Sequence, residues 1–158
     1  MPTFAIESNG RLEKTAVYYN GEQIGGVKEI FLSLNEDGDF DAIIQYEGVD
    51  RNIHTKNIFT DSLDKIKVVE PSFTEEEAKE LQLLEIESDG DIQNTMVYYN
   101  NEPLEGLVSL YLHIKATQNK NGIRSLFSSK RNIPDTLEFK SEFIFRNEDD
   151  TLESEVIF

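Results

Sequence analysis

One eight-residue segment occurs twice in the chain, and this repeat constrains the fold more than any other feature. Thr15-Ala-Val-Tyr-Tyr-Asn-Gly-Glu22 returns as Thr95-Met-Val-Tyr-Tyr-Asn-Asn-Glu102. Asn-Gly between apolar runs predicts a two-residue β-hairpin turn, because both turn residues must adopt a positive φ angle. Asn also tolerates that conformation, so Asn100-Asn101 predicts the same turn in the second segment.

The similarity extends beyond the hairpin. Ile6–Leu34 aligns without gaps with Ile86–Ile114, and 12 of the 29 aligned residues are identical. We interpret this as an internal duplication. The predicted domains are a first β repeat over residues 1–70, a linker with a short helix over 71–82 and a second β repeat over 83–158. Because only 38% of the residues are hydrophobic, we expect the repeats to share one core.

The spacing of apolar residues predicts which strand faces are buried. The hairpin turn pairs Val17 with Ile24, and side chains alternate along a strand with a period of two. The predicted core face therefore carries Ile24, Ile30, Leu32 and Leu34 in the first repeat and Leu104, Val108, Leu110, Leu112 and Ile114 in the second. The opposite face carries Tyr18, Val27 and Phe31 in the first repeat and Tyr98, Leu107 and Tyr111 in the second. The strand predicted from Glu22 to Leu34 is long, so Gly25-Gly26, and Gly106 in the second repeat, predict a bulge or bend within it.

Alternating and turn-bounded segments predict the remaining elements. Further strands are expected at Phe4–Ser8, Phe40–Tyr46, Arg51–Lys56, Ile66–Val69, Leu83–Ser88, Leu137–Phe145 and Leu152–Phe158. Thr74 and Glu77 form a capping-box pattern that predicts a helix to Gln82, and Asp61–Asp64 suggests one helical turn. The predicted fold is mostly β: two tandem β-meander units form a pseudo-symmetric β-sandwich or two apposed sheets, joined by a short helix. Which sheet faces meet stays open.

The charge balance favours a basic protein as the partner. The chain has 31 acidic and 15 basic residues, a formal net charge of −16. Direct binding to nucleic acid or to an anionic membrane is not expected, because phosphate contacts need clustered Lys and Arg. A solvated surface without a partner is the plain alternative.

Two groups of residues are candidate binding sites. The segment 115–131 contains five basic residues and no acidic one, which indicates a basic insertion that acts as a site or as an electrostatic tether; these residues are Lys115, Lys120, Arg124, Lys130 and Arg131. The outward aromatic residues Tyr18, Phe31, Tyr98 and Tyr111 form the second group. Packing between the repeats is the simpler explanation for these aromatic residues.

No catalytic, metal or cofactor site is predicted. The chain has no cysteine, its histidines are His54 and His113, and no nucleophile or phosphate-loop motif is present. The acidic clusters at turns lack the spacing of a calcium-binding loop. We therefore expect a protein that is not an enzyme. The absence of cysteine, of a signal-peptide pattern and of a long apolar run favours the cytoplasm.

The first hairpin also resembles a known group of proteins. The pattern Thr-x-Val-Tyr-x-Asn-Gly-x-x-Ile-x-Gly-Val-x-x-Ile covers Thr15–Ile30 and is similar to small, mostly uncharacterised β-rich proteins encoded by bacteriophages and mobile elements. The second repeat departs from it at Asn101, Leu104, Leu107 and Leu110. The resemblance implies a phage or mobile-element context, in which the compartment would be the host cytoplasm. It carries over no functional residues.

Three functions fit these observations. The first is a non-enzymatic acidic binding protein that blocks a basic protein partner, such as a phage anti-defence inhibitor, an immunity protein or a DNA mimic. The second is a structural or adaptor component of a phage or mobile-element assembly. The third is a β-sandwich that binds a carbohydrate or another small ligand. A homo-oligomer is compatible with all three.

Overall fold

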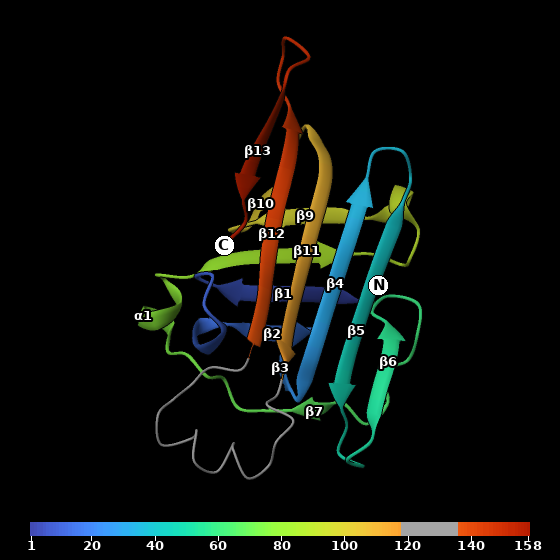
Figure 1. Ribbon diagram of the computed structural model, residues 1–158, viewed down its shortest axis with the longest axis vertical. Coiled ribbons are helices and arrows are strands. Elements are labelled where there is room, and N and C mark those ends of the chain that lie inside the picture. The colour runs from blue at the N-terminus through green and yellow to red at the C-terminus, as the bar shows by residue number, and fades with distance from the viewer. Residues whose placement is uncertain (118–135) are drawn as a thin grey trace.

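The computed structural model describes residues 1–117 and 136–158, and within these ranges the chain forms two antiparallel β-sheets (Figure 1). Sheet A has the strand order β10-β9-β8-β1-β2-β3-β7, and sheet B has the order β13-β12-β11-β4-β5-β6. The predicted mostly-β fold with two sheets is confirmed.

The strands of sheet A are β1 (Thr3–Ser8), β2 (Ala16–Tyr19), β3 (Glu22–Gly25), β7 (Lys67–Val68), β8 (Gln82–Glu87), β9 (Met96–Tyr99) and β10 (Glu102–Pro103). Those of sheet B are β4 (Val27–Asn35), β5 (Phe40–Glu47), β6 (Ile53–Asn57), β11 (Leu107–Thr117), β12 (Thr136–Arg146) and β13 (Leu152–Val156). The helical elements are the 3-10 turns η1 (Leu12–Lys14) and η2 (Ile92–Asn94) and the helix α1 (Glu75–Ala78).

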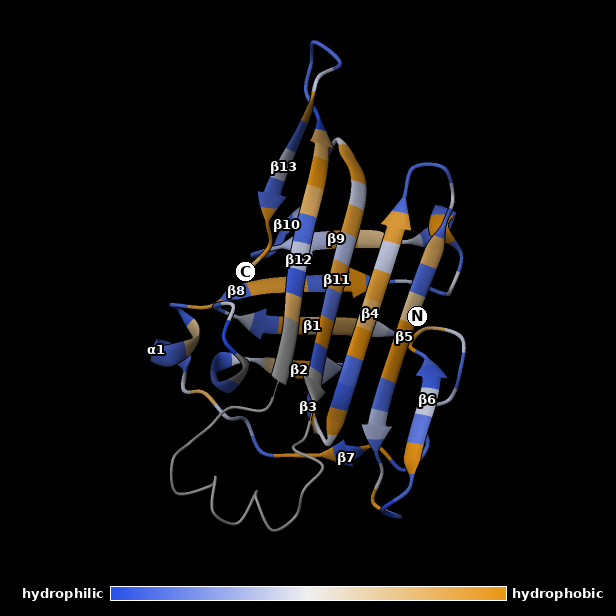
Figure 2. Cartoon of the chain, viewed as in Figure 1, coloured by the Kyte–Doolittle hydropathy of each residue, from blue (hydrophilic) through white to orange (hydrophobic). Residues whose placement is uncertain are grey.

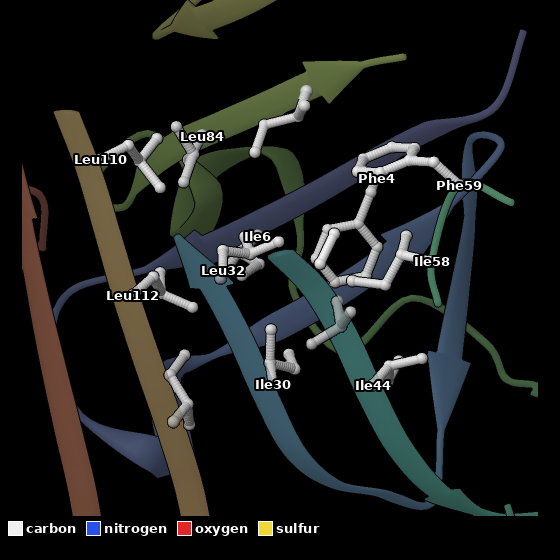
Figure 3. Close-up of a cluster of buried hydrophobic side chains, with 14 of the residues drawn as sticks. Phe4, Ile6, Ile30, Leu32, Ile44, Ile58, Phe59, Leu84, Leu110 and Leu112 are labelled. Carbon is white, nitrogen blue, oxygen red and sulfur yellow. The ribbon is translucent and has the colours of Figure 1, made fainter. Parts of the chain in front are cut away.

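The two sheets pack face to face with their strands crossing at a steep angle (Figure 1). Side chains from both sheets fill the space between them (Figure 3). Phe4, Ile6 and Leu84 from sheet A meet Leu32 and Leu112 from sheet B, and each is at most 1% exposed. Both repeats therefore contribute to one continuous core.

The strand order places equivalent segments of the two repeats symmetrically. β1 pairs with β8 at the middle of sheet A, and β4 pairs with β11 at the middle of sheet B. In sheet A, β2 and β3 follow β1 on one side, and β9 and β10 follow β8 on the other. In sheet B, β5 and β6 follow β4 on one side, and β12 and β13 follow β11 on the other. β7 extends sheet A on the side of the first repeat. The predicted domain boundaries at residues 70 and 83 stay predictions.

Both hairpin turns have the predicted conformation. Asn20 and Gly21 have φ angles of 51° and 85°, and Asn100 and Asn101 have φ angles of 52° and 70°. The turns are fixed in the same way, because the Asn20 side chain accepts a hydrogen bond from the Thr3 amide and the Asn100 side chain accepts one from the Leu83 amide. The repeated asparagines thus join each hairpin to the strand beside it.

The long strand predicted from Glu22 to Leu34 is divided between the two sheets. The chain bends at Gly26, whose φ angle is 76°, so that β3 belongs to sheet A and β4 to sheet B. Gly106, with a φ angle of 71°, makes the corresponding bend between β10 and β11. The glycines were predicted to mark a bulge or bend, but the transfer to a second sheet was not predicted.

The bends also correct the predicted strand faces. The register shifts between Val27 and Glu29 and between Leu107 and Ser109, as a β-bulge requires. Val27 and Leu107 consequently pack against the core, whereas the alternation had assigned them to the outer face. Val108, assigned to the core face, is only partly buried for the same reason.

Two predicted helical segments are also revised. α1 begins after Thr74 with the expected capping box, but it ends at Ala78 because β8 already starts at Gln82. Asp61–Asp64 forms turns and bends without a helix. The other predicted strands lie within a few residues of the observed bounds.

Candidate functional site

The five basic residues of the predicted insertion fall mostly outside the described residues. Lys115 lies near the end of β11 with an exposed side chain. Lys120, Arg124, Lys130 and Arg131 lie outside the described ranges. The interpretation of segment 115–131 as a binding site or a tether therefore stays a prediction.

The four outward aromatic residues occupy two separate faces. Tyr18 and Tyr98 lie on β2 and β9 of sheet A, and Phe31 and Tyr111 lie on β4 and β11 of sheet B. The core separates the outer face of one sheet from that of the other. The prediction that Tyr18 lies beside Phe31 and Tyr98 beside Tyr111 is therefore wrong, because the bends at Gly26 and Gly106 move the chain from sheet A to sheet B.

On sheet B the aromatic residues are already in contact with protein groups. Phe31 packs edge-on against Tyr111, with ring centroids 5.6 Å apart, and against His113 at 5.8 Å. The Lys140 ammonium lies 5.4 Å from the Tyr111 ring centroid, and His113 Nε2 lies 2.6 Å from a Glu29 carboxylate oxygen. Acidic and basic groups are therefore interspersed on this face, and Figure 2 shows that hydrophilic and hydrophobic residues alternate along its strands.

On sheet A four outward residues form a cross-strand row, and two further glutamates flank it. The register aligns Tyr98 with Glu85, Glu85 with Ala5 and Ala5 with Tyr18. Since neighbouring strands lie about 4.8 Å apart, roughly 14 Å separates the backbones at the two tyrosines. Glu7 and Glu87 lie on the same side, two residues along from Ala5 and Glu85 respectively.

We call the outward side of β1, β2, β8 and β9 the acidic face. It includes Ala5, Glu7, Tyr18, Glu85, Glu87 and Tyr98. These four strands contain no Lys, Arg or His at any position. The carboxylates of the acidic face therefore have no basic side chain from these four strands to neutralise them, in contrast to the outer face of sheet B.

A hollow of about 250 Å³ lies on the acidic face next to Tyr18. Its lining includes Thr3, Ala5, Glu7, Tyr18, Leu83 and Glu85. Ala5 has the smallest side chain in the row, so the surface is lower there than at its neighbours. We call this depression the Tyr18 hollow.

One hydrogen bond fixes a wall of the Tyr18 hollow. The Tyr18 hydroxyl donates to Glu7 Oε1 at 3.1 Å. Burial of the ring, and secondly the negative charge of Glu7, raise the pKa of Tyr18 to about 12. The phenol therefore stays protonated at physiological pH. Glu85, on the other side of Ala5, makes no hydrogen bond or ion pair within the described residues.

Two other hollows lie at equivalent bends of the two repeats. One of about 170 Å³ is lined by Val17, Ile24 and Val27, and one of about 290 Å³ by Val97, Leu104 and Leu107. They mark the places where the chain passes from one sheet to the other. Several residues that line each of these two hollows also pack on the core, whereas the Tyr18 hollow lies on the outer face of sheet A.

The two histidines are distant in the fold. His54 Nε2 lies 3.1 Å from both Asp50 carboxylate oxygens, and its ring stacks on Tyr46 at 5.3 Å. The bond from His54 is the main cause that lowers the pKa of Asp50. Within residues 1–117 and 136–158, no group of three His, Asp or Glu side chains is arranged to hold a metal ion.

Ala5, Glu7 and Glu85 are site residues that the sequence prediction missed. The alternation of Phe4 and Ile6 with Ala5 and Glu7, and of Leu84 and Ile86 with Glu85 and Glu87, was a usable signal for which side chains face outward. This alternation does not reveal that β1 pairs directly with β8, because the two strands belong to different repeats.

Comparison with known proteins gives no assignment. No protein-family model, no curated protein and no solved structure matches the chain. In the part of the chain that the structure describes, no helix is long and apolar enough to span a bilayer.

Proposed function

We propose that this protein is a non-enzymatic acidic binding protein whose acidic face docks on a basic protein partner and blocks it. The supporting observation is the acidic face, on which Glu7, Glu85 and Glu87 lie near Tyr18 and Tyr98 without a basic residue on the four central strands. Aromatic residues supply contact area at interfaces, and unneutralised carboxylates attract a cationic surface. Such a protein would act as a phage anti-defence inhibitor, an immunity protein or a DNA mimic.

Small-ligand binding has less support. The outward aromatic residues are divided between two faces, and Phe31 and Tyr111 contact each other. The Tyr18 hollow of about 250 Å³ is smaller than the roughly 300–1,000 Å³ typical of small-molecule sites. A sugar chain would therefore find one tyrosine at the hollow and no common aromatic platform.

The proposal is tested with purified basic nucleases and DNA-binding proteins at low, physiological and high ionic strength. We expect binding to at least one of them, with affinity falling steeply as salt rises, because a field from unpaired carboxylates is screened within roughly 8–10 Å. Neutral proteins of similar size serve as controls. Binding that is insensitive to salt, or binding only to the neutral proteins, overturns the proposal.

A further inference from the structure

We propose that the Tyr18 hollow is an arginine pocket, which receives the guanidinium side chain of one arginine on the surface of the basic partner. This inference rests on the proposed function and specifies how the acidic face recognises its partner. It concerns one position on that face rather than its total charge.

The shape of the hollow fits a single side chain. Ala5 forms its floor, and the neighbours on the same cross-strand row are the larger Tyr18 and Glu85. The volume of about 250 Å³ is below the range of drug-sized sites, and the hollow is open to the surface. A side chain that projects from a docked protein can therefore enter it from outside.

The lining offers contacts for each part of an arginine. The methyl group of Ala5 and the side chain of Leu83 lie where the apolar stem would pass. Glu85 has both carboxylate oxygens unbonded within the described residues, and Glu7 uses one oxygen for the Tyr18 hydroxyl. A guanidinium binds a carboxylate through two parallel hydrogen bonds.

The Tyr18 ring distinguishes arginine from lysine. A planar guanidinium stacks on an aromatic face and keeps its donors free at the edges, whereas an ammonium is a compact and strongly hydrated charge. The hydrogen bond to Glu7 anchors the tip of the ring at the wall of the hollow. The hollow should therefore prefer arginine to lysine at equal charge.

The hollow exists because the two repeats carry residues of different size at the position of Ala5. Ala5 and Glu85 are equivalent in the repeats and pair directly with each other across β1 and β8. A glutamate in place of Ala5 would fill the floor with a larger side chain. It would also make the face more acidic, so this substitution separates the pocket from the total charge.

The test compares two peptides of equal length and charge, one with arginine and one with lysine as its basic residues. Their binding to the full chain is measured by calorimetry, and the amide signals of Ala5 and Tyr18 are followed by NMR. We expect the arginine peptide to bind about tenfold more tightly. In Ala5→Glu this preference should disappear although the protein has gained a negative charge.

Two further variants keep the test decisive if Ala5→Glu does not fold. Glu85→Gln should also remove the arginine preference, because it takes away the free carboxylate of the hollow. Glu87→Gln makes the same charge change on the same face outside the lining, so it should weaken both peptides equally and preserve the preference.

The outcomes separate the pocket from the proposed function. Equal, salt-sensitive binding of both peptides, with no shift at Ala5 or Tyr18, overturns the arginine pocket and leaves the acidic docking face standing. An arginine preference that survives in Glu85→Gln also overturns the pocket. If neither peptide binds at low salt, the pocket is overturned, and the docking face is then decided by the tests on folded basic proteins.

Discussion

Leu32 and Leu112 pair directly with each other across β4 and β11, and they occupy the same position in the two repeats. The flanking pairs are reciprocal, since Ile30 meets Ile114 and Leu34 meets Leu110. In sheet A the equivalent residues Ala5 and Glu85 pair in the same manner. One pseudo-two-fold relationship therefore runs through both sheets. The repeats carry the same residue at the Leu32–Leu112 pair and different residues at the Ala5–Glu85 pair.

The leucine pair should be a main contributor to stability. Both side chains are 0% exposed, so Leu32→Ala and Leu112→Ala should each lower the free energy of unfolding by about 2–5 kcal/mol. The double variant should deviate from the sum, because the two residues are in contact. Urea unfolding measures these values, with Ser33→Ala on the outer face as the control. If either substitution lowers the free energy of unfolding by less than about 1 kcal/mol, the result contradicts a core that both repeats share.

The bend at Gly26 should tolerate no side chain. Its φ angle is 76°, and an added Cβ would lie 2.5 Å from the Glu47 carbonyl oxygen. Gly21 also has a positive φ angle, but no atom lies within 4 Å of its added Cβ. Gly21→Ala should therefore cost about 1–2 kcal/mol from backbone strain alone, and Gly26→Ala should cost clearly more. Equal costs in thermal or urea unfolding would show that the close approach to Glu47 is unimportant.

Ionisation of Tyr18 should make the fold sensitive to alkali. Its pKa is about 12 in the folded chain against an ordinary value of 10.0, so folding favours the protonated phenol. The resulting stability is fully present below pH 10 and is lost as the pH rises towards 12. The difference in free energy of unfolding between the wild type and Tyr18→Phe should therefore shrink over this interval. A difference that stays constant would contradict the burial of the phenol beside Glu7.

Much of the fold follows from local sequence signals. The turn residues Asn20 and Gly21 and the pairing of Val17 with Ile24 are as predicted, because a two-residue turn fixes the register. The alternation also identifies Ile30, Leu32, Leu34, Leu110, Leu112 and Ile114 as core residues. Strict alternation failed at Val27 and Leu107, where a bulge adds a residue to one strand. A glycine indicates that a bend is possible, but the sheet that the chain joins afterwards depends on contacts distant in sequence.

The candidate site was less accessible to prediction. Tyr18 and Tyr98 were identified as outward residues, but their assignment to one face with Phe31 and Tyr111 was wrong. The site depends on Ala5 lying between Tyr18 and Glu85, which requires the pairing of β1 with β8. That pairing joins segments about 80 positions apart, and no local periodicity encodes it. The sequence predicted an acidic binding protein, and the structure supplies a specific face on which to test that proposal.

The most direct test of the docking face compares two triple variants with the same change of charge. The first variant neutralises the acidic face through Glu7→Gln, Glu85→Gln and Glu87→Gln. The second variant neutralises three carboxylates associated with sheet B through Asp41→Asn, Glu142→Gln and Glu148→Gln. Both are titrated against the basic protein that binds the wild type most tightly. We predict that the first variant weakens binding at least tenfold, mainly through slower association, while the second changes it by less than about threefold. An equal loss in the two variants would show that total charge, and not the acidic face, governs binding.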